Sequence, residues 1–201
     1  MKGEDVKDLF IVGIDIAQYS LKPLESQKEA QLVIDNALND AVRNGAPAKR
    51  EKPEWLDGGD GGYALFEWNS GREVLEVIKI FTEALKRRNL GSLPDHTVSV
   101  RVALHHGKVL CWKGQRGKRF TSHAINECAR LLAALSRDPG RVACSGEFLE
   151  KITGLDDVAQ PIRLKDVVDK HGISHEFYNL QQDPGFGIAP KSSDRHENPF
   201  V

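Results

Sequence analysis

The sequence predicts an α+β domain in which one sheet carries helices packed mainly on one face. Short runs of β-branched and apolar residues, typical of strands, alternate with longer segments whose apolar residues recur at helical spacing. Their order is strand, helix, two strands, helix, two strands, helix, with a further strand after them. The 201 residues, 40% of them hydrophobic, show no compositional break, so one core is expected.

The first half of the chain is predicted to contain a strand followed by a helix, and then a hairpin followed by a second helix. Residues 9–16 form a nearly continuous apolar run, as a strand covered on both faces requires. Pro23 can open the following helix, and Gly45 falls where its apolar stripe ends. A glycine-rich turn then joins strands at 55–56 and 63–68 into a hairpin. The second helix is predicted from apolar residues at helical spacing: Val74, Val77, Ile78, Phe81 and Leu85.

The middle of the chain predicts two more strands and a third helix. Strands are expected at 98–104 and 109–112, with residues 105–108 forming a polar turn between them. The basic run at 113–119 is short and turn-like. A helix is expected at about 124–135.

The last third of the chain predicts short strands and then a tail. A strand is expected at 142–144, and segments 162–168 and 175–180 are expected to form a terminal hairpin. Residues 1–180 are therefore expected to form one domain. Residues 181–201, rich in glycine and proline and poor in apolar residues, are expected to form a flexible tail.

Composition limits the classes of function. A net charge of −1 argues against a broad nucleic-acid surface, which needs clustered surplus basic residues. Cys111, Cys128 and Cys144 lack disulfide or metal spacing, which favours free thiols in a reducing compartment. No apolar stretch has the length of a membrane segment, and the N-terminus lacks a signal-peptide core. We therefore expect a cytoplasmic protein.

Two acidic residues beside predicted strands suggest a metal site. Asp15 ends the first apolar run, and Asp60 lies among glycines at the tip of the predicted hairpin. Carboxylates on rigid strand ends suit Mg²⁺, which takes one or two protein carboxylates and completes its shell with water and substrate phosphate. Judged singly, each aspartate is equally well explained as a turn residue.

A polar pair marks the third helix. Asn126 and Arg130 are four residues apart and project from one face, where an amide and a guanidinium can hold ribose or phosphate oxygens. From spacing alone, an ordinary solvated pair is the simpler interpretation. The same holds for Lys108 and Lys165, which singly are surface charges.

The order of these motifs resembles the catalytic domain of class III nucleotidyl cyclases, the family of adenylate and guanylate cyclases, over about residues 9–180. Segment 59–66 (Gly-Asp-Gly-Gly-Tyr-Ala-Leu-Phe) looks like the family's hairpin, and 100–109 looks like its strand followed by His, Gly and a basic residue. Segment 125–131 (Ile-Asn-Glu-Cys-Ala-Arg-Leu) resembles the family's Asn-to-Arg helix, and 161–165 resembles its phosphate-lysine segment. The resemblance implies a ferredoxin-like, class III cyclase palm with a mainly antiparallel sheet.

The resemblance assigns the first half-site to metal and triphosphate. Asp15 and Asp60 would bind two Mg²⁺ or Mn²⁺ ions per site, and the Ile16 carbonyl would add a ligand. The backbone amides around Ala17 to Ser20, including those of Tyr19 and Ser20, would face the triphosphate.

The resemblance assigns the second half-site to the ribose and the reacting phosphate. Asn126 would orient the ribose, Arg130 would stabilise charge on the α-phosphate, and Lys165 would hold the β- and γ-phosphates. Lys108 would contact phosphate from the metal-bearing protomer. The ribose 3'-hydroxyl would attack the α-phosphate in line and release pyrophosphate. Because the family combines the halves from two subunits and this chain carries both, a homodimer with interfacial sites is expected.

The base-reading positions depart from those of purine cyclases. The matching positions here are Leu56, beside Trp55, and Arg119 or a neighbour of it; the pairs that read adenine or guanine are missing. A donor-only Arg suits the uracil carbonyl, and an apolar wall narrows the pocket. This combination is similar to compact bacterial pyrimidine cyclases of anti-phage signalling, so UTP is the preferred substrate. A cytidylate cyclase or a divergent adenylate cyclase stays open.

Other classes of function remain as alternatives. A dimeric nucleotide sensor without catalysis would have lost the metal aspartates, which are present. A diguanylate cyclase would carry an acidic residue and a Phe after Gly58-Gly59-Asp60, and neither is there. A transition-metal site at His105 and His106 lacks a third ligand at suitable spacing, and a strand-end turn explains the pair better.

Overall fold

The elements alternate much as the sequence predicts. The computed structural model describes residues 4–45, 51–115, 117–135, 140–152, 161–164, 166–168, 172 and 174–180. The elements in chain order are β1 (Asp5–Ile16), η1 (Tyr19–Leu21), α1 (Leu24–Gly45), β2 (Glu54–Asp57), β3 (Gly61–Phe66), α2 (Gly71–Asn89), η2 (Pro94–His96), β4 (Val100–Gly114), β5 (Gly117–Thr121), α3 (His123–Ala134), β6 (Val142–Ser145), α4 (Gly146–Leu149), β7 (Ile162–Arg163), β8 (Val167–Val168), β9 (Ser174–His175) and β10 (Phe177–Asn179).

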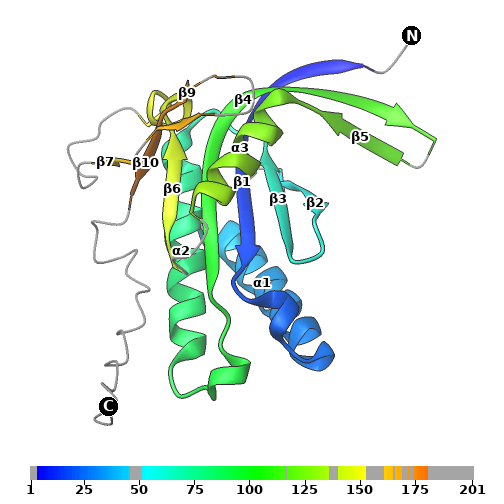
Figure 1. The fold of residues 1–201 in the computed structure, drawn as a ribbon. Coiled ribbons are helices and arrows are strands. Elements are labelled where there is room, and N and C mark those ends of the chain that lie inside the picture. Colours follow the sequence, from blue (N-terminus) through cyan, green and yellow to red (C-terminus); the bar gives the residue numbers. More distant parts are fainter. Residues whose placement is uncertain are drawn as a thin grey trace.

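One mixed, mainly antiparallel sheet organises the domain. Its strands follow the order β2-β3-β1-β4-β6-β10-β7, while β5 pairs with β4 and the short strands β8 and β9 pair with each other (Figure 1). The pairing of β4 with β6 is parallel, and the other pairings are antiparallel. The predicted fold class is therefore confirmed.

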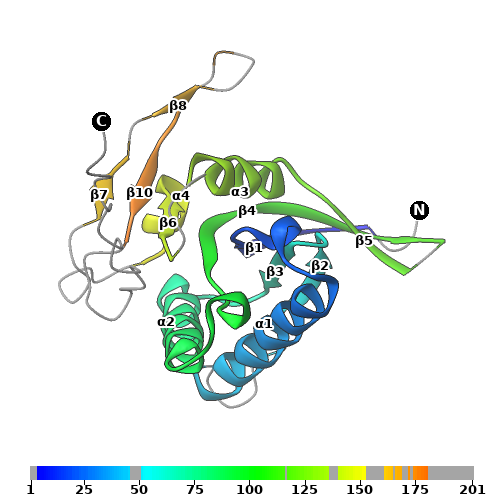
Figure 2. The same cartoon turned by 60° about the horizontal axis from the view of Figure 1, so that its bottom comes forward.

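Helices cover both faces of the sheet, with the two long ones together on one face. Helices α1 and α2 lie on one side of β1 and β4, and α3 lies on the other (Figure 2). Alternate residues of β1 consequently enter two cores: Phe10 and Val12 face α1 and α2, whereas Leu9 and Ile11 face α3. Burial on both sides explains the nearly continuous apolar run.

Helix α3 packs unusually close to the middle of β1. A Cβ atom at Gly13 would lie 2.8 Å from Leu132 Cδ1 and 2.9 Å from Cys128 Sγ. Glycine at this position therefore lets the helix approach the strand. The three cysteines are free and buried, and burial raises the pKa of Cys128 to about 12.

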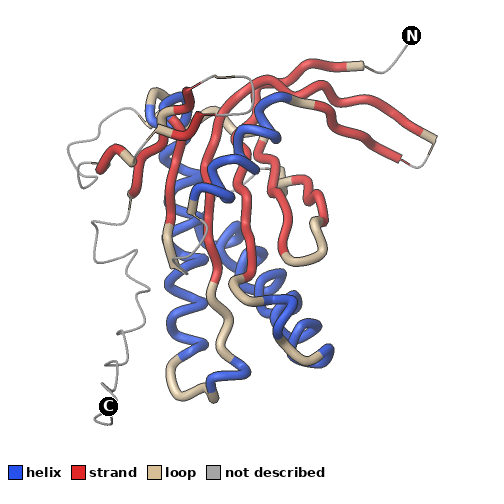
Figure 3. Tube along the Cα trace, in the orientation of Figure 1, coloured by secondary structure: helices blue, strands red, loops and turns tan. Residues whose placement is uncertain are grey.

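The predicted turn at 105–108 is wrong, because these residues lie within the continuous strand β4 (Figure 3). The His105 side chain is buried, and its Nδ1 lies 2.8 Å from Ser145 Oγ. His106 packs on Phe10 of β1, with ring centroids 4.7 Å apart. Contacts with residues distant in the chain thus accommodate these two histidines in a strand, although the local sequence indicates a turn. Burial lowers the pKa of both.

The basic run at 113–119 is also mostly strand rather than turn. Lys113 pairs with Lys118, and the turn is confined to the segment between Gly114 and Gly117. The hairpin of β4 and β5 extends past the helices, beside the start of β1 (Figure 1). The terminal hairpin is confirmed, since β10 pairs with β7 and β9 with β8. Residues 181–201, expected to be a tail, lie outside the described residues.

Candidate active site

The end of β1 and the β2–β3 hairpin bring the two predicted metal aspartates together. Asp15 pairs in register with Gly61, and the Ile16 amide donates a hydrogen bond to the Asp60 carbonyl at 2.8 Å. Gly61 has φ +153°, and a Cβ there would lie 2.0 Å from the Ile14 carbonyl oxygen. Only glycine permits this approach, which fixes the hairpin against β1.

The half-buried Tyr63 lies close enough to Asp15 and Asp60 to be influenced by both carboxylates. Burial is the main cause that raises the pKa of Tyr63, and Cys128, Asp15 and Asp60 add to it electrostatically. Both carboxylates therefore act on the face of the sheet that carries Tyr63, which is the face covered by α3. Strand alternation places Asp15 on the α3 side, together with Leu9 and Ile11.

Arg101 is a site residue that the sequence reasoning missed. It lies opposite Asp15 in the register of β4. Its Nε donates to Asp15 Oδ2 at 2.8 Å, and its NH2 contacts the same oxygen. The two side chains are only 21% and 19% exposed. The sequence does contain a sign of this role, because Arg101 is the single charged residue in the otherwise apolar segment 100–104.

The Arg101–Asp15 pair is expected to stabilise the domain without metal. In a double-mutant cycle of Asp15→Asn, Arg101→Gln and the double variant, urea unfolding should give a coupling free energy of about 1–2 kcal/mol. The reason is that the pair is largely shielded from water. Additive single effects would contradict this, showing that the contact contributes nothing to folding.

The turn that carries Asp60 is held by hydrogen bonds of residues that are not proposed metal ligands. Asp57 Oδ1 accepts from the Gly59 amide at 3.0 Å, and Gly58 N donates to the Gly61 carbonyl at 2.9 Å. Gln31 of α1 donates to the Gly59 carbonyl at 2.6 Å. Asp57 and Gly58 therefore form these hydrogen bonds of the turn, and neither bond uses the Asp60 side chain.

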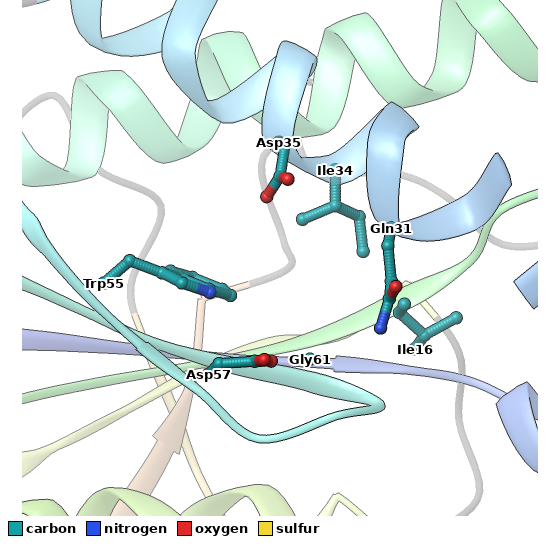
Figure 4. Close-up of a pocket in the computed structure, with 7 residues that line it drawn as sticks. All are labelled: Ile16, Gln31, Ile34, Asp35, Trp55, Asp57 and Gly61. Carbon is teal, nitrogen blue, oxygen red and sulfur yellow. The ribbon is translucent and has the colours of Figure 1, made fainter. Parts of the chain in front are cut away.

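A cavity of about 230 Å³ lies between α1 and this hairpin. Gln31 and Asp35 of α1 point toward Trp55 and Asp57 of the hairpin (Figure 4). Its lining includes neither Asp15 nor Asp60, and α1 covers the face of the sheet opposite α3. The cavity nevertheless adjoins the candidate metal site, because its lining includes Ile16 and Gly61, the chain neighbours of the two aspartates.

The structure of the segment after β1 reduces the number of residues that can contact the triphosphate as predicted. The Ala17 amide donates to the Ser99 carbonyl at 2.9 Å, so it belongs to the sheet edge. Gln18 adopts a left-handed conformation with φ 58°, and Tyr19 and Ser20 then open the short helix η1. Of the predicted segment, Tyr19 and Ser20 remain the candidates for phosphate.

The second half-site surrounds the N-terminal half of α3. Ser122 caps α3 by accepting from the Ala124 amide at 2.8 Å, and it donates to the Lys108 carbonyl at 2.5 Å. Asn126 and Lys108 line a cavity of about 710 Å³. The Lys108 ammonium lies 3.3 Å from Asp8 Oδ2 and is exposed. Arg130 follows one helical turn after Asn126.

Lys108 lies far from the aspartates of its own protomer. Along β4, Lys108 pairs with Asp8 and Arg101 pairs with Asp15. The two pairs are seven positions apart, which corresponds to roughly 23 Å. One protomer therefore does not place Lys108 beside Asp15, whereas α3 reaches Gly13, two residues before Asp15.

The base-reading candidates lie on β2 and β5, two strands that do not pair with each other but are linked by a side-chain contact. Lys118 of β5 bonds Glu54 of β2 at 2.6 Å, and Phe120 packs in the same core as Leu56. Arg119 alternates with these residues and pairs with Trp112 on the other side of β5. Strand geometry thus turns Lys118, a neighbour of Arg119, toward β2. Lys165 lies outside the described residues.

Comparison with solved structures identifies the fold. The guanylyl cyclase Cya2 superposes with a TM-score of 0.70 at 13% identity, over 95% of this chain and 98% of that one. The adenylyl cyclase CyaB from P. aeruginosa gives 0.65 at 13%, over 88% and 95%. The guanylate cyclase domain of RhGC from Catenaria anguillulae, in complex with GTP, gives 0.68 at 12%, over 88% and 97%. The chain has the fold of the class III cyclase catalytic domain.

Sequence comparison adds no family assignment: no family model matches, and no curated protein matches. Within the described ranges, no helix is long and apolar enough to cross a membrane. In that same part of the chain, no three His, Cys, Asp or Glu side chains converge as a complete metal-binding set. Mg²⁺ does not require one, because water and phosphate oxygens complete its shell.

Proposed function

We propose that this protein is a class III nucleotidyl cyclase, which converts a nucleoside triphosphate to a 3',5'-cyclic nucleotide and pyrophosphate. The observation that carries the proposal is the junction of β1 with the β2–β3 hairpin, where Asp15 and Asp60 meet on a cyclase fold. The solved structures with this fold include an adenylyl cyclase and a guanylyl cyclase.

Asp15, Asp60 and the Ile16 carbonyl would hold two Mg²⁺ or Mn²⁺ ions. All three supply the hard oxygen ligands that these ions prefer. Bound ions would neutralise phosphate charge and activate the attacking hydroxyl. Because Arg101 already bonds Asp15, it must share or release that carboxylate when a cation binds.

Asn126 and Arg130 act on the other side of the substrate in this proposal. Asn126 orients the ribose, and Arg130 stabilises the charge that builds on the α-phosphate. Lys108 and Lys165 bind phosphate oxygens, and Tyr19 and Ser20 offer backbone amides. The presence of both half-sites in one chain supports a homodimer in which each active site takes one half from each subunit.

UTP is the proposed substrate, and cyclic UMP in bacterial anti-phage signalling is the proposed role. Half-buried Leu56 supplies an apolar wall on β2, as a pyrimidine pocket requires. A basic residue of β5 would donate to the uracil O4 carbonyl, and it would oppose the amine of cytosine. Arg119 is the first candidate for this donor, and Lys118 is its neighbour facing β2.

Base choice is tested by incubating the purified protein with Mn²⁺ and each of the four ribonucleoside triphosphates. We expect cyclic UMP as the main product by mass spectrometry, with CTP second. Arg119→Ala or Lys118→Ala should lower the preference for UTP by about 1–3 kcal/mol, because a base contact is lost. Preference for ATP would contradict the pyrimidine assignment. An unchanged preference for UTP in both variants would show that another residue recognises the base.

A catalytically inactive nucleotide sensor is the second candidate. The bond from Arg101 to Asp15 favours it, since this carboxylate is already neutralised without a metal. A sensor would bind nucleotide and release no pyrophosphate. Product formed from any triphosphate by the wild-type protein, and lost in Asp60→Asn, excludes this alternative.

A further inference from the structure

Glu127 links Arg130 to the C-terminal strands. Its Oε1 contacts the Arg130 NH1 within α3. Its Oε2 lies 2.8 Å from Nδ1 of His175, which belongs to β9. The three side chains are 20%, 33% and 12% exposed, so this row of charges is largely shielded from water.

His175 is held in place from two directions. It pairs with Val167 of β8, and its ring stacks on Phe177 at 6.2 Å between centroids and 14° between planes. Phe177 is 1% exposed and belongs to the core under α3. The imidazole is therefore a fixed point against which Glu127 can be oriented.

The contact of Glu127 with His175 is electrostatic rather than an aligned hydrogen bond. The Glu127 Oε2 atom is buried and accepts no well-oriented hydrogen bond from the described residues. A buried carboxylate oxygen is stabilised by a nearby proton, which favours the imidazole form that carries its proton on Nδ1.

We propose that Glu127 and His175 are positioning residues that hold the Arg130 guanidinium for the α-phosphate; this inference rests on the proposed cyclase function. Arginine has a long, flexible side chain, and a transition-state donor is most effective when it is already in place. Glu127 fixes one end of the guanidinium. His175 attracts the other carboxylate oxygen, which limits how far Glu127 neutralises Arg130.

The location of these residues connects them with the second half-site. Glu127 directly follows Asn126 in α3, and both line the cavity of about 710 Å³ together with His175. A change at Glu127 therefore acts on the half-site that contains Arg130. Neither Asp15 nor Asp60 lines this cavity, so the change alters no side chain of their junction.

The kinetic test compares Glu127→Gln, Glu127→Asp and His175→Asn with wild type. Glu127→Gln should lower kcat about tenfold, with the KM for the triphosphate within about twofold, because the lost contact matters in the transition state. Glu127→Asp should recover part of the loss, and His175→Asn, which retains a donor, should lose less than His175→Phe. Glu83→Gln removes an exposed i,i+3 partner of Lys86 on α2 and should leave kcat unchanged.

Mixing experiments locate the defect. Glu127→Gln mixed with Asp60→Asn should regain activity, whereas Glu127→Gln mixed with Arg130→Ala should not. Recovery with Arg130→Ala would place Glu127 in the other half-site. A kcat equal to or above that of wild type would also overturn the proposal, and a higher kcat would show that Glu127 masks Arg130.

A measurement without turnover separates this inference from the proposed function. The ¹⁵N side-chain NMR signal of Arg130, assigned with Arg130→Lys, should lose its protection from solvent exchange in Glu127→Gln and retain it in Glu83→Gln. An unchanged signal in Glu127→Gln overturns the positioning role. Absence of cyclase activity in the wild-type protein would contradict the proposed function, and the NMR result would still decide whether Glu127 holds Arg130.

Discussion

Asp60→Asn is expected to lower turnover at least about a thousandfold while the domain remains folded. The substitution retains the shape of the side chain and removes the negative charge on which cation binding depends. Asp60 is exposed at the hairpin, so the free energy of unfolding should change little. Pyrophosphate release at saturating Mn²⁺, together with urea unfolding, measures both effects.

The matched control for this variant lies in the same hairpin. Asp57→Asn removes the same charge, but the asparagine oxygen can still accept the bond from the Gly59 amide. Its turnover should stay within about twofold of wild type. Asp15→Asn should be inactive as well, with an additional loss of stability because Arg101 loses its partner. Substantial turnover in Asp60→Asn at saturating Mn²⁺ would remove this carboxylate from the site.

Mixing inactive Asp60→Asn with inactive Arg130→Ala is expected to restore about a quarter of the wild-type activity. After equal mixing and random exchange, half of the dimers are mixed, and each mixed dimer has one intact site of two. The physical basis is that one chain carries both halves of the proposed site, so a mixed dimer unites the wild-type Asp60 of one subunit with the wild-type Arg130 of the other. The measurement is turnover as a function of mixing ratio, which should peak at equal amounts.

Two controls define the result of this experiment. Subunit exchange is verified with differently labelled chains, and Asp60→Asn mixed with Asp15→Asn should stay inactive, because both lesions affect the same half-site. Continued inactivity of the Asp60→Asn and Arg130→Ala mixture despite verified exchange would show that the site does not form between subunits.

Much of the fold was predictable because local pattern and tertiary environment agree. The apolar run of β1 is buried on both faces, and α1 begins directly after Pro23, as the sequence predicts. The β2–β3 hairpin follows from its glycines, since Gly61 must adopt a conformation and an approach that other residues do not tolerate. These features depend on the chain near each residue.

The errors fall where distant residues decide local structure. His105 and His106 lie in a strand because Ser145 and Phe10 accommodate them, and neither partner is near in sequence. Strand β5 was missed because a run rich in basic residues indicates a turn, although pairing with β4 makes most of it strand. The base-reading position, Arg119 or a neighbour, stays a prediction; strand alternation turns its neighbour Lys118 toward β2.

The amino-acid sequence predicts the order of the elements and four candidate site residues: Asp15, Asp60, Asn126 and Arg130. Hydrophobic spacing predicts the elements, whereas the candidate residues rest on the order of motifs that resembles the class III cyclases. Folding adds that Arg101 bonds Asp15, that Glu127 joins Arg130 to His175, and that Lys108 lies roughly 23 Å from Asp15 along β4. The reason is that strand register and helix packing bring together residues far apart in the chain, and no local pattern encodes those distances.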